Sequence, residues 1–219
     1  STALAFEHAS DFAASADNAI KRMCDIIASL IGIILLTPVW IIVAAMVRLH
    51  DGGPAFFKQE RVGLDGTTFT MFKFRTMHVD AEAMKASLAE ANEADASAGN
   101  SVMFKMANDP RVTRIGAFLR KTSIDELPQL FNVLRGDMSL VGPRPPLPSE
   151  VAQYEPRVMG KFAVRPGITG LWQISGRSNL SWDETVHLDL SYAQHRSLTL
   201  DAWIVLQTIP ALLRHEGAY

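Results

Sequence analysis

The chain has 219 residues, of which 48% are hydrophobic, a formal net charge of -2 and one cysteine. This length suits one domain, with or without a membrane element. The near-neutral charge argues against a nucleic-acid partner, because nucleic-acid-binding domains usually carry a basic excess. The single cysteine, Cys24, excludes an intrachain disulfide and favours a reducing compartment.

The first long feature is an uncharged apolar run from Ile26 to Val47. As a helix it would rise roughly 33 Å at about 1.5 Å per residue, enough to cross a hydrocarbon core of about 30 Å. Thr37 and Pro38 lie at its centre, where a proline removes a backbone donor and bends or breaks a helix. The run therefore predicts either a kinked spanning helix or a hairpin that enters and leaves by one face. Basic residues flank both ends and favour the hairpin, because cationic flanks prefer the cytoplasmic side.

Two strands are expected next, in "FFKQERVGLDGTTFTMFKFRTM", on either side of a Gly-Leu-Asp-Gly turn. Lys73 and Arg75 are two residues apart and so project from one face. They form either a solvated basic pair or part of a phosphate site. The alanine-rich, acidic segment that follows, 80–105, predicts a solvated helix or a mobile insert.

The segment "SIDELPQLFNVLRGDMSLVGPRP" combines a short helix with two adjacent acids. A helix with one buried face is predicted by the apolar spacing of Leu127, Leu130, Phe131 and Leu134, and Gly136 is a typical stop. Asp125 and Glu126 then lie at or just before the helix N-terminus. Acids at that position commonly cap backbone N–H groups, which is the structural alternative to a catalytic role.

Cationic residues surround these acids in the sequence. Basic residues outnumber acidic ones two to one between Arg111 and Arg177. Arg120 lies just upstream of the acids and could hold a phosphate. Arg144 is fixed between two prolines and loses little entropy on binding an oxyanion through two hydrogen bonds. A carboxylate that faces a cation-bound phosphate can serve as a nucleophile or a metal ligand.

The motifs "IDELPQLFNVLRGDMSLVGPRP", "FKFRTM", "RPGITGLWQISGR" and "LDLSYA" occur in this order, and together they resemble the bacterial sugar transferase family. The resemblance runs from about Lys21 onward and is to monotopic polyprenyl-phosphate sugar-1-phosphate transferases that begin exopolysaccharide assembly. It implies transfer of a hexose 1-phosphate from a UDP-hexose to undecaprenyl phosphate, with release of UMP and a requirement for Mg²⁺. It also implies a re-entrant helix-break-helix at the cytoplasmic face of the bacterial inner membrane. The family break is often Ser-Pro, and Thr37-Pro38 keeps the hydroxyl.

The resemblance also assigns site residues. Asp125 is expected to attack the sugar-linked phosphorus, and Glu126 to act as a base or as a second carboxylate ligand of Mg²⁺ beside Asp125. Matches to family positions that bind substrate are Arg120, Arg144, Lys73 and Asp189. Arg165 and Arg177 flank glycine turns, where they either contact nucleotide or sugar or only shape the turns. Asp189 is equally well explained as a helix-surface or capping acid.

Two alternatives remain open. In the first, Asp125 is only a Mg²⁺ ligand and the transfer is direct, in a ternary complex. In the second, the chain is a non-catalytic, membrane-anchored module that binds lipid phosphate or nucleotide. Two acids inside an anion site argue against the second alternative, because a pure anion binder gains nothing from them. The sequence does not distinguish glucose from galactose and leaves the oligomeric state open, a homo-oligomer included.

We therefore expect an α+β fold, mainly helical, in which a cytosolic catalytic domain contains a small β-hairpin or sheet. The expected divisions are an N-terminal tail or interfacial segment at 1–20, a re-entrant membrane hairpin at 21–50 and the catalytic domain at 51–219.

Overall fold

The structure is a computed structural model that describes residues 2–85, 109–176 and 180–214. It is mainly helical with two small sheets, which confirms the expected α+β class. Arg177 and the expected insert beyond residue 85 lie outside the described residues. The helices are α1 (Thr2–Asp51), α2 (Ala81–Lys85), α3 (Arg114–Lys121), α4 (Gln129–Arg135), α5 (Pro148–Val151), α6 (Leu171–Ile174), α7 (Trp182–His195) and α8 (Leu198–Arg214). The strands are β1 (Phe56–Val62), β2 (Thr68–Phe74), β3 (Ser139–Val141) and β4 (Gly167–Thr169), and short 3₁₀ turns are η1 (Leu64–Gly66), η3 (Ile124–Glu126) and η4 (Pro156–Ala163).

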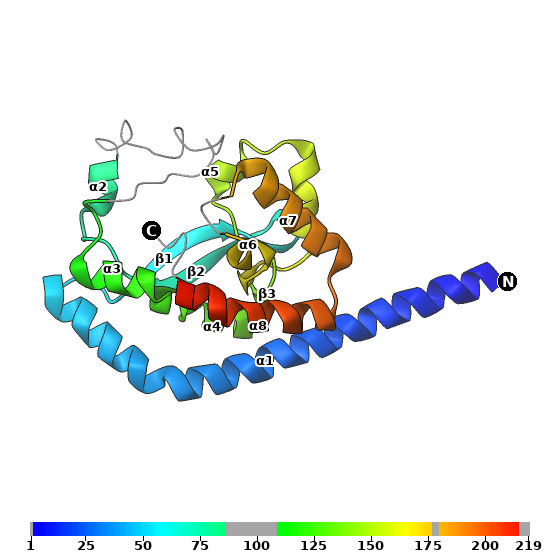
Figure 1. The fold of residues 1–219 in the computed structure, drawn as a ribbon, viewed down its shortest axis with the longest axis horizontal. Coiled ribbons are helices and arrows are strands. Elements are labelled where there is room, and N and C mark those ends of the chain that lie inside the picture. Colours follow the sequence, from blue (N-terminus) through cyan, green and yellow to red (C-terminus); the bar gives the residue numbers. More distant parts are fainter. Residues whose placement is uncertain (1, 86–108, 177–179, 215–219) are drawn as a thin grey trace.

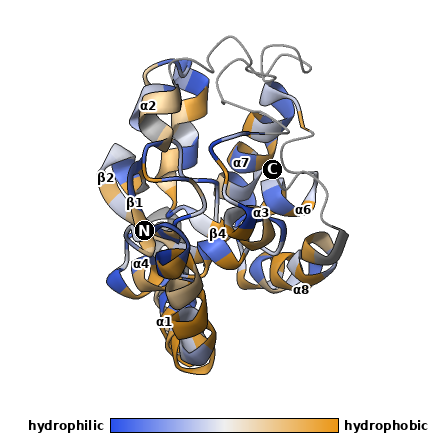
Figure 2. Ribbon diagram, turned by 90° about the vertical axis from the view of Figure 1, so that its left-hand side faces the viewer, coloured by the Kyte–Doolittle hydropathy of each residue, from blue (hydrophilic) through white to orange (hydrophobic). Residues whose placement is uncertain are grey.

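Helix α1 is continuous through the segments expected as a tail and a hairpin, with Pro38 inside it. Figure 1 shows that α1 runs along one side of the fold and bends in its second half. Thr37 Oγ1 donates a hydrogen bond to the carbonyl oxygen of Ile33, one turn earlier, at 2.7 Å. The part from Asp17 to Asp51 is long and apolar enough to cross a membrane. Figure 2 shows that α1 lies below the domain and is mostly hydrophobic there, and Ile34, Leu35 and Ile41 are among its exposed apolar residues.

The domain binds α1 near both ends of its apolar run. At the first end, Arg22 donates to the carbonyls of Val133 and Leu134 at the end of α4, at 2.5 and 2.8 Å. At the other end, Asp51 pairs with Arg75, just beyond β2. Between these ends lies a shared apolar core, formed by Trp40, Val43 and Val47 of α1 with Phe74, Leu119 and Leu130. The apolar run is therefore held against a single domain along its length.

Strands β1 and β2 form the antiparallel hairpin that the sequence predicts, with Phe56 opposite Phe74 and Val62 opposite Thr68. The turn between them needs Asp65 and Gly66 at positive φ, 54° and 73°. Glycine takes this conformation at no steric cost, and aspartate tolerates it better than most residues. The hairpin forms one wall of the site described below.

Helix α3 is fixed tightly against the segment that follows β2. Thr113 caps it, since its hydroxyl accepts a hydrogen bond from the N–H of Gly116 at 2.8 Å. A Cβ at Gly116 would lie 1.8 Å from the carbonyl oxygen of Thr76, so only glycine allows this approach. The contact places the C-terminal end of α3, with Arg120, beside Thr76.

Helix α4 forms where the sequence predicts it and ends at Gly136, which has φ of 93°. The predicted buried face is wrong in part, because Phe131 is 41% exposed and contacts Trp40 of α1 in a tilted arrangement, with ring centroids 5.2 Å apart. Asn132 is buried in its place and joins α4 to β2. Its side chain donates to the carbonyl of Thr70 at 2.7 Å and accepts from the N–H of Phe72 at 3.0 Å.

Candidate active site

The hairpin, α3, η3 and the segments around β3 and α6 enclose a cleft of about 840 Å³. A cleft of this size is typical of small-molecule sites. Its charged lining residues are Lys58, Arg61, Lys73, Arg75, Arg111, Arg120, Arg144, Asp125 and Glu126. Cations therefore outnumber acids in the lining, which suits a ligand with several negative charges.

The two acids lie in the 3₁₀ turn η3, immediately before α4. Ser123 enters this turn at φ of 55°. Neither η3 nor α4 has a side-chain cap hydrogen bond at its N-terminus, so the capping explanation for the acids gains no support. Asp125 is only 7% exposed, and burial raises the pKa of its carboxyl group to about 6, with Glu126 adding to the rise and Lys73 opposing it.

Lys73 and Arg120 bring positive charge to the acids from two different elements. Lys73 Nζ, on β2, lies 2.7 Å from Glu126 Oε1. Arg120 is held by its Nε, which donates to Thr76 Oγ1 at 3.0 Å. Burial lowers the pKa of Arg120 and nearby Asp125 opposes this change, so the guanidinium stays charged at neutral pH. Both cations are placed to neutralise an anion that approaches Asp125.

Arg144 is held in place by Glu150 of α5. The two guanidinium nitrogens donate to the two carboxylate oxygens at 3.0 and 3.2 Å, and Glu150 also accepts from the N–H of Leu147 at 2.8 Å. Burial alone would lower the pKa of Arg144, but the adjacent Glu150 carboxylate raises it overall. The pair fixes the guanidinium at the wall of the cleft.

Arg61, on β1, adds a second guanidinium close to Arg144. It donates to the carbonyl of Pro145 at 2.9 Å and to Gln59 Oε1 at 3.1 and 2.6 Å. Burial, followed by the charge of Arg144, lowers the pKa of Arg61 to about 10. It therefore remains charged at neutral pH, and two adjacent arginines suit a phosphate or pyrophosphate.

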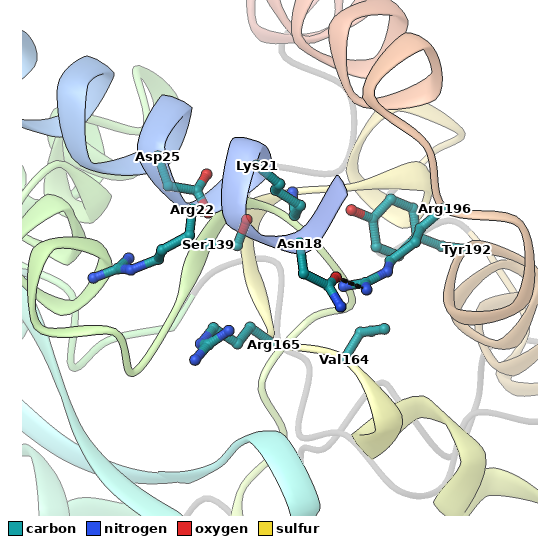
Figure 3. A pocket seen from close by; sticks show the side chains of 9 residues that line it. All are labelled: Asn18, Lys21, Arg22, Asp25, Ser139, Val164, Arg165, Tyr192 and Arg196. Carbon is teal, nitrogen blue, oxygen red and sulfur yellow. Dashed lines mark hydrogen bonds between the residues drawn. The ribbon is translucent and has the colours of Figure 1, made fainter. Parts of the chain in front are cut away.

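Two other predicted substrate-binding residues, Asp189 and Arg165, lie outside the cleft. Asp189 is buried in α7 and pairs with Lys161 of η4 at 2.5 Å, and neither residue lines the cleft. Arg165 lines a separate cavity of about 20 Å³ between α1 and the second half of the domain (Figure 3). Its Nε donates to the carbonyl of Gly136 at 2.9 Å. Arg177 lies outside the described residues.

A magnesium ion fits the cleft only together with a phosphate-bearing ligand. Among residues 2–85, 109–176 and 180–214, no group of three or more His, Cys, Asp or Glu side chains forms a metal site. Mg²⁺ is commonly held by one or two carboxylates, with substrate phosphates and water completing its shell. Asp125 and Glu126 supply the two carboxylates of such a site, and the other ligands would come from substrate phosphate and water.

Several residues that line the cleft or support its lining are not predicted from the sequence. Glu150 could have been found from "LPSE", where an acid occupies the third position of a helix that starts at proline. Trp172 and Gln173 lie inside a quoted motif, but no pattern within the motif separates a ligand contact from a packing residue. Arg61 had no sequence signal beyond its charge.

The sequence profile of the family described as "Bacterial sugar transferase" matches residues 16–215. The chain belongs to the bacterial sugar transferase family. The family membership that the motifs predict is therefore confirmed.

Three bacterial sugar transferases illustrate the similarity. The chain is 47% identical over 199 residues to "Galactosyl transferase CpsE" of Streptococcus agalactiae, covering 90% of this chain and 43% of that protein. It is 44% identical over 200 residues to "Undecaprenyl-phosphate galactose phosphotransferase" of Salmonella typhimurium, covering 91% and 42%. It is 40% identical over 209 residues to "UDP-glucose:undecaprenyl-phosphate glucose-1-phosphate transferase" of Caulobacter vibrioides, covering 91% and 72%. The chain thus spans less than half the length of the first two relatives.

Proposed function

We propose that this chain transfers a hexose 1-phosphate from a UDP-hexose to undecaprenyl phosphate and releases UMP, as the first membrane step of exopolysaccharide assembly. The observation that carries the proposal is the buried carboxylate of Asp125 inside a cleft whose charged lining residues are mainly cations. The relatives named for undecaprenyl-phosphate transfer of galactose and glucose phosphates support this substrate class.

In the first step, a carboxylate oxygen of Asp125 attacks the phosphorus that carries the hexose. The bond from this phosphorus to the oxygen that bridges the two phosphates breaks, and UMP leaves with the bond's electron pair. Lys73 and Arg120 lie where they can neutralise the reacting phosphate, and Arg61 and Arg144 where they can hold the other phosphate. Positioning and charge neutralisation are the main contributions that a protein makes to phosphoryl transfer.

In the second step, an oxygen of undecaprenyl phosphate attacks the phosphorus of the phospho-aspartate. The acyl phosphate bond breaks, Asp125 regains its carboxylate and the lipid receives the hexose phosphate through a new pyrophosphate link. A covalent intermediate divides one difficult transfer into two easier ones. Glu126 either assists the incoming lipid phosphate as a base or shares a metal ion with Asp125.

Asp125 and Glu126 would hold Mg²⁺ together with substrate phosphate oxygens. When bound, the ion would supply further neutralisation of the pyrophosphate charge.

The covalent route is tested by intact-mass measurement of the protein after incubation with Mg²⁺ and UDP-glucose or UDP-galactose, without lipid acceptor. We expect an added hexose phosphate that maps to Asp125, and the productive donor identifies the sugar. No adduct, despite turnover once undecaprenyl phosphate is added, would favour direct transfer in a ternary complex. No turnover with either donor would contradict the proposed function.

The rate of adduct formation should depend on pH with an apparent pKa near 6. Because burial raises the pKa of Asp125 to about 6, the reactive carboxylate is present above that pH and is lost below it. The rate should therefore be nearly constant above pH 7 and fall about tenfold per pH unit well below 6. Leaving out the lipid acceptor removes its own phosphate titration from the profile. A rate that stays constant down to pH 5 would exclude Asp125 as the titrating nucleophile.

The membrane arrangement that we propose for α1 is a re-entrant hairpin at the cytoplasmic face of the inner membrane. Support comes from Arg22 and Asp51, which hold the two ends of the apolar run to the same domain. A helix that spanned the bilayer would carry these ends to opposite sides and break one of the two attachments. The bend of α1 leaves its outer apolar surface available for lipid (Figures 1 and 2).

Single cysteines introduced on either side of the apolar run should react from the same side of the membrane. In a Cys24→Ser background, Asp17→Cys and Asp183→Cys place thiols at exposed positions. Both should react with a membrane-impermeant maleimide in inside-out vesicles and be protected in spheroplasts. Leu35→Cys, on the apolar surface, is the control that should react in neither preparation. Labelling of Asp17→Cys in spheroplasts alone would establish a spanning helix.

A further inference from the structure

One end of the cleft carries two polar atoms that have no hydrogen-bond partner among the described residues. These are the indole N–H of Trp172 and Oε1 of Gln173, both shielded from solvent, and both residues line the cleft. Gln173 Nε2 donates to the carbonyl of Ile168 at 3.1 Å, which assigns Oε1 as the remaining acceptor. Unpaired buried polar groups are rare in native structures, because each loses its hydrogen bonds to water without a replacement. A ligand that forms hydrogen bonds with them removes this free-energy penalty.

Backbone hydrogen bonds join this end of the cleft to the loop that carries Arg144. The N–H of Gly167, which begins β4, donates to the carbonyl of Pro143 at 2.9 Å. The N–H of Gly142 donates to the carbonyl of Thr169 at 2.9 Å. Arg144 is therefore adjacent to β4, which leads directly into α6 and the two unpaired groups.

On its other side, the arginine pair approaches the acids. Arg61 donates a hydrogen bond to the carbonyl of Pro145, next to Arg144. It also lies close enough to Glu126 for that carboxylate to raise the pKa of Arg61, against the larger effect of burial. The two arginines are thus adjacent both to the carboxylates and, through β4, to the segment that carries the donor and acceptor of α6. In a nucleoside diphosphate sugar that reacts at Asp125, the second phosphate likewise lies between the reacting phosphorus and the nucleoside.

We propose that Trp172 and Gln173 recognise the uracil base of the donor. The indole N–H donates to the ring carbonyl oxygen O4, and Gln173 Oε1 accepts from the ring N3–H. This inference rests on the proposed function, and it assigns the base to the end of the cleft formed by β4 and α6. A donor and an acceptor that are both unpaired in the same cleft complement the O4 and N3–H edge of uracil and conflict with cytosine, whose amino group at C4 and unprotonated N3 reverse both roles.

Binding of UMP and CMP, measured by isothermal titration calorimetry on the detergent-solubilised full chain, tests the inference without any hexose. The wild type should prefer UMP over CMP by about 100-fold, because a mismatched polar edge leaves groups unpaired on both sides. Trp172→Phe and Gln173→Leu should each weaken UMP binding by about 10- to 100-fold and reduce the preference over CMP. The preference is a ratio within one variant, so a general loss of stability does not change it.

Matched controls are Trp203→Phe and Gln153→Leu, which alter exposed residues outside the cleft and should leave both affinities unchanged. Equal weakening of UMP and CMP would overturn the inference, because it would indicate a packing role. A higher KM for the UDP-hexose with unchanged UMP affinity would also overturn it, and would assign the pair to the hexose. A wild type that neither binds UMP nor forms the hexose phosphate adduct would instead contradict the proposed function.

Discussion

Asp125→Asn should abolish transfer, lowering the turnover number by about 10⁴-fold or more, because the amide cannot form the phospho-aspartate. The side chain keeps its size, so the turn η3 and the cleft should remain intact. Removing a negative charge from a cation-lined cleft should preserve or strengthen the binding of the UDP-hexose. Steady-state turnover, calorimetric binding and the intact-mass assay together separate loss of chemistry from loss of binding.

Two further variants sharpen this experiment. Asp183→Asn makes the same chemical change at an exposed position and should retain wild-type turnover. Glu126→Gln distinguishes the two roles proposed for that acid. If the variant accumulates the adduct in the presence of acceptor, Glu126 serves the second step; if the adduct fails to form, Glu126 serves the first. Turnover of Asp125→Asn near the wild-type value would exclude the nucleophilic role.

Asp189→Ala should reduce the free energy of unfolding by about 3–5 kcal/mol, because it leaves the charge of Lys161 buried without a partner. Asp189 is 2% exposed and Lys161 is 6% exposed, and Lys161 Nζ lies 2.5 Å from Asp189 Oδ2. This is the largest stability effect that we expect from a single polar substitution. Urea unfolding of the detergent-solubilised protein, followed by circular dichroism, measures it.

The double variant Lys161→Met/Asp189→Leu distinguishes a stabilising role of Asp189 from a role in substrate binding. Replacing both members of a buried pair by apolar side chains of similar volume is often neutral or stabilising. We therefore expect it to recover most of the stability and to retain the affinity for the UDP-hexose. A stable double variant with a strongly raised KM would restore the substrate-binding role that the family resemblance implies for Asp189.

The sequence predicted local structure well where short-range chemistry decides it. The β1–β2 hairpin follows from two β-rich segments around a glycine turn, and the end of α4 follows from Gly136. The buried face of α4 was misread because burial there depends on two neighbours distant in the chain. Phe131 faces Trp40 of α1, while Asn132 enters the interior to bond the edge of β2.

The same limit applies to the site. Asp125, Glu126, Lys73, Arg120 and Arg144 were predicted from charge and motif, and the structure brings all five to one cleft. Asp189 was chosen as a substrate ligand from its motif alone, and its partner Lys161, 28 positions away, becomes visible only when α7 packs on η4. Glu150 was missed because an acid in a first helical turn is usually explained by capping alone.

On the proposed function, the attachment of α1 also determines where the two substrates would meet. The cleft lining begins at Pro54, three residues after α1 ends at Asp51, and so within roughly 10 Å of that end. With the apolar run in the bilayer, the lipid phosphate need not leave the headgroup layer to reach the acids, while the nucleotide arrives from water. In the proposed reaction the enzyme would then reach its acceptor by lateral diffusion in two dimensions, and the acceptor's surface density, rather than its bulk concentration, would govern the second half-reaction.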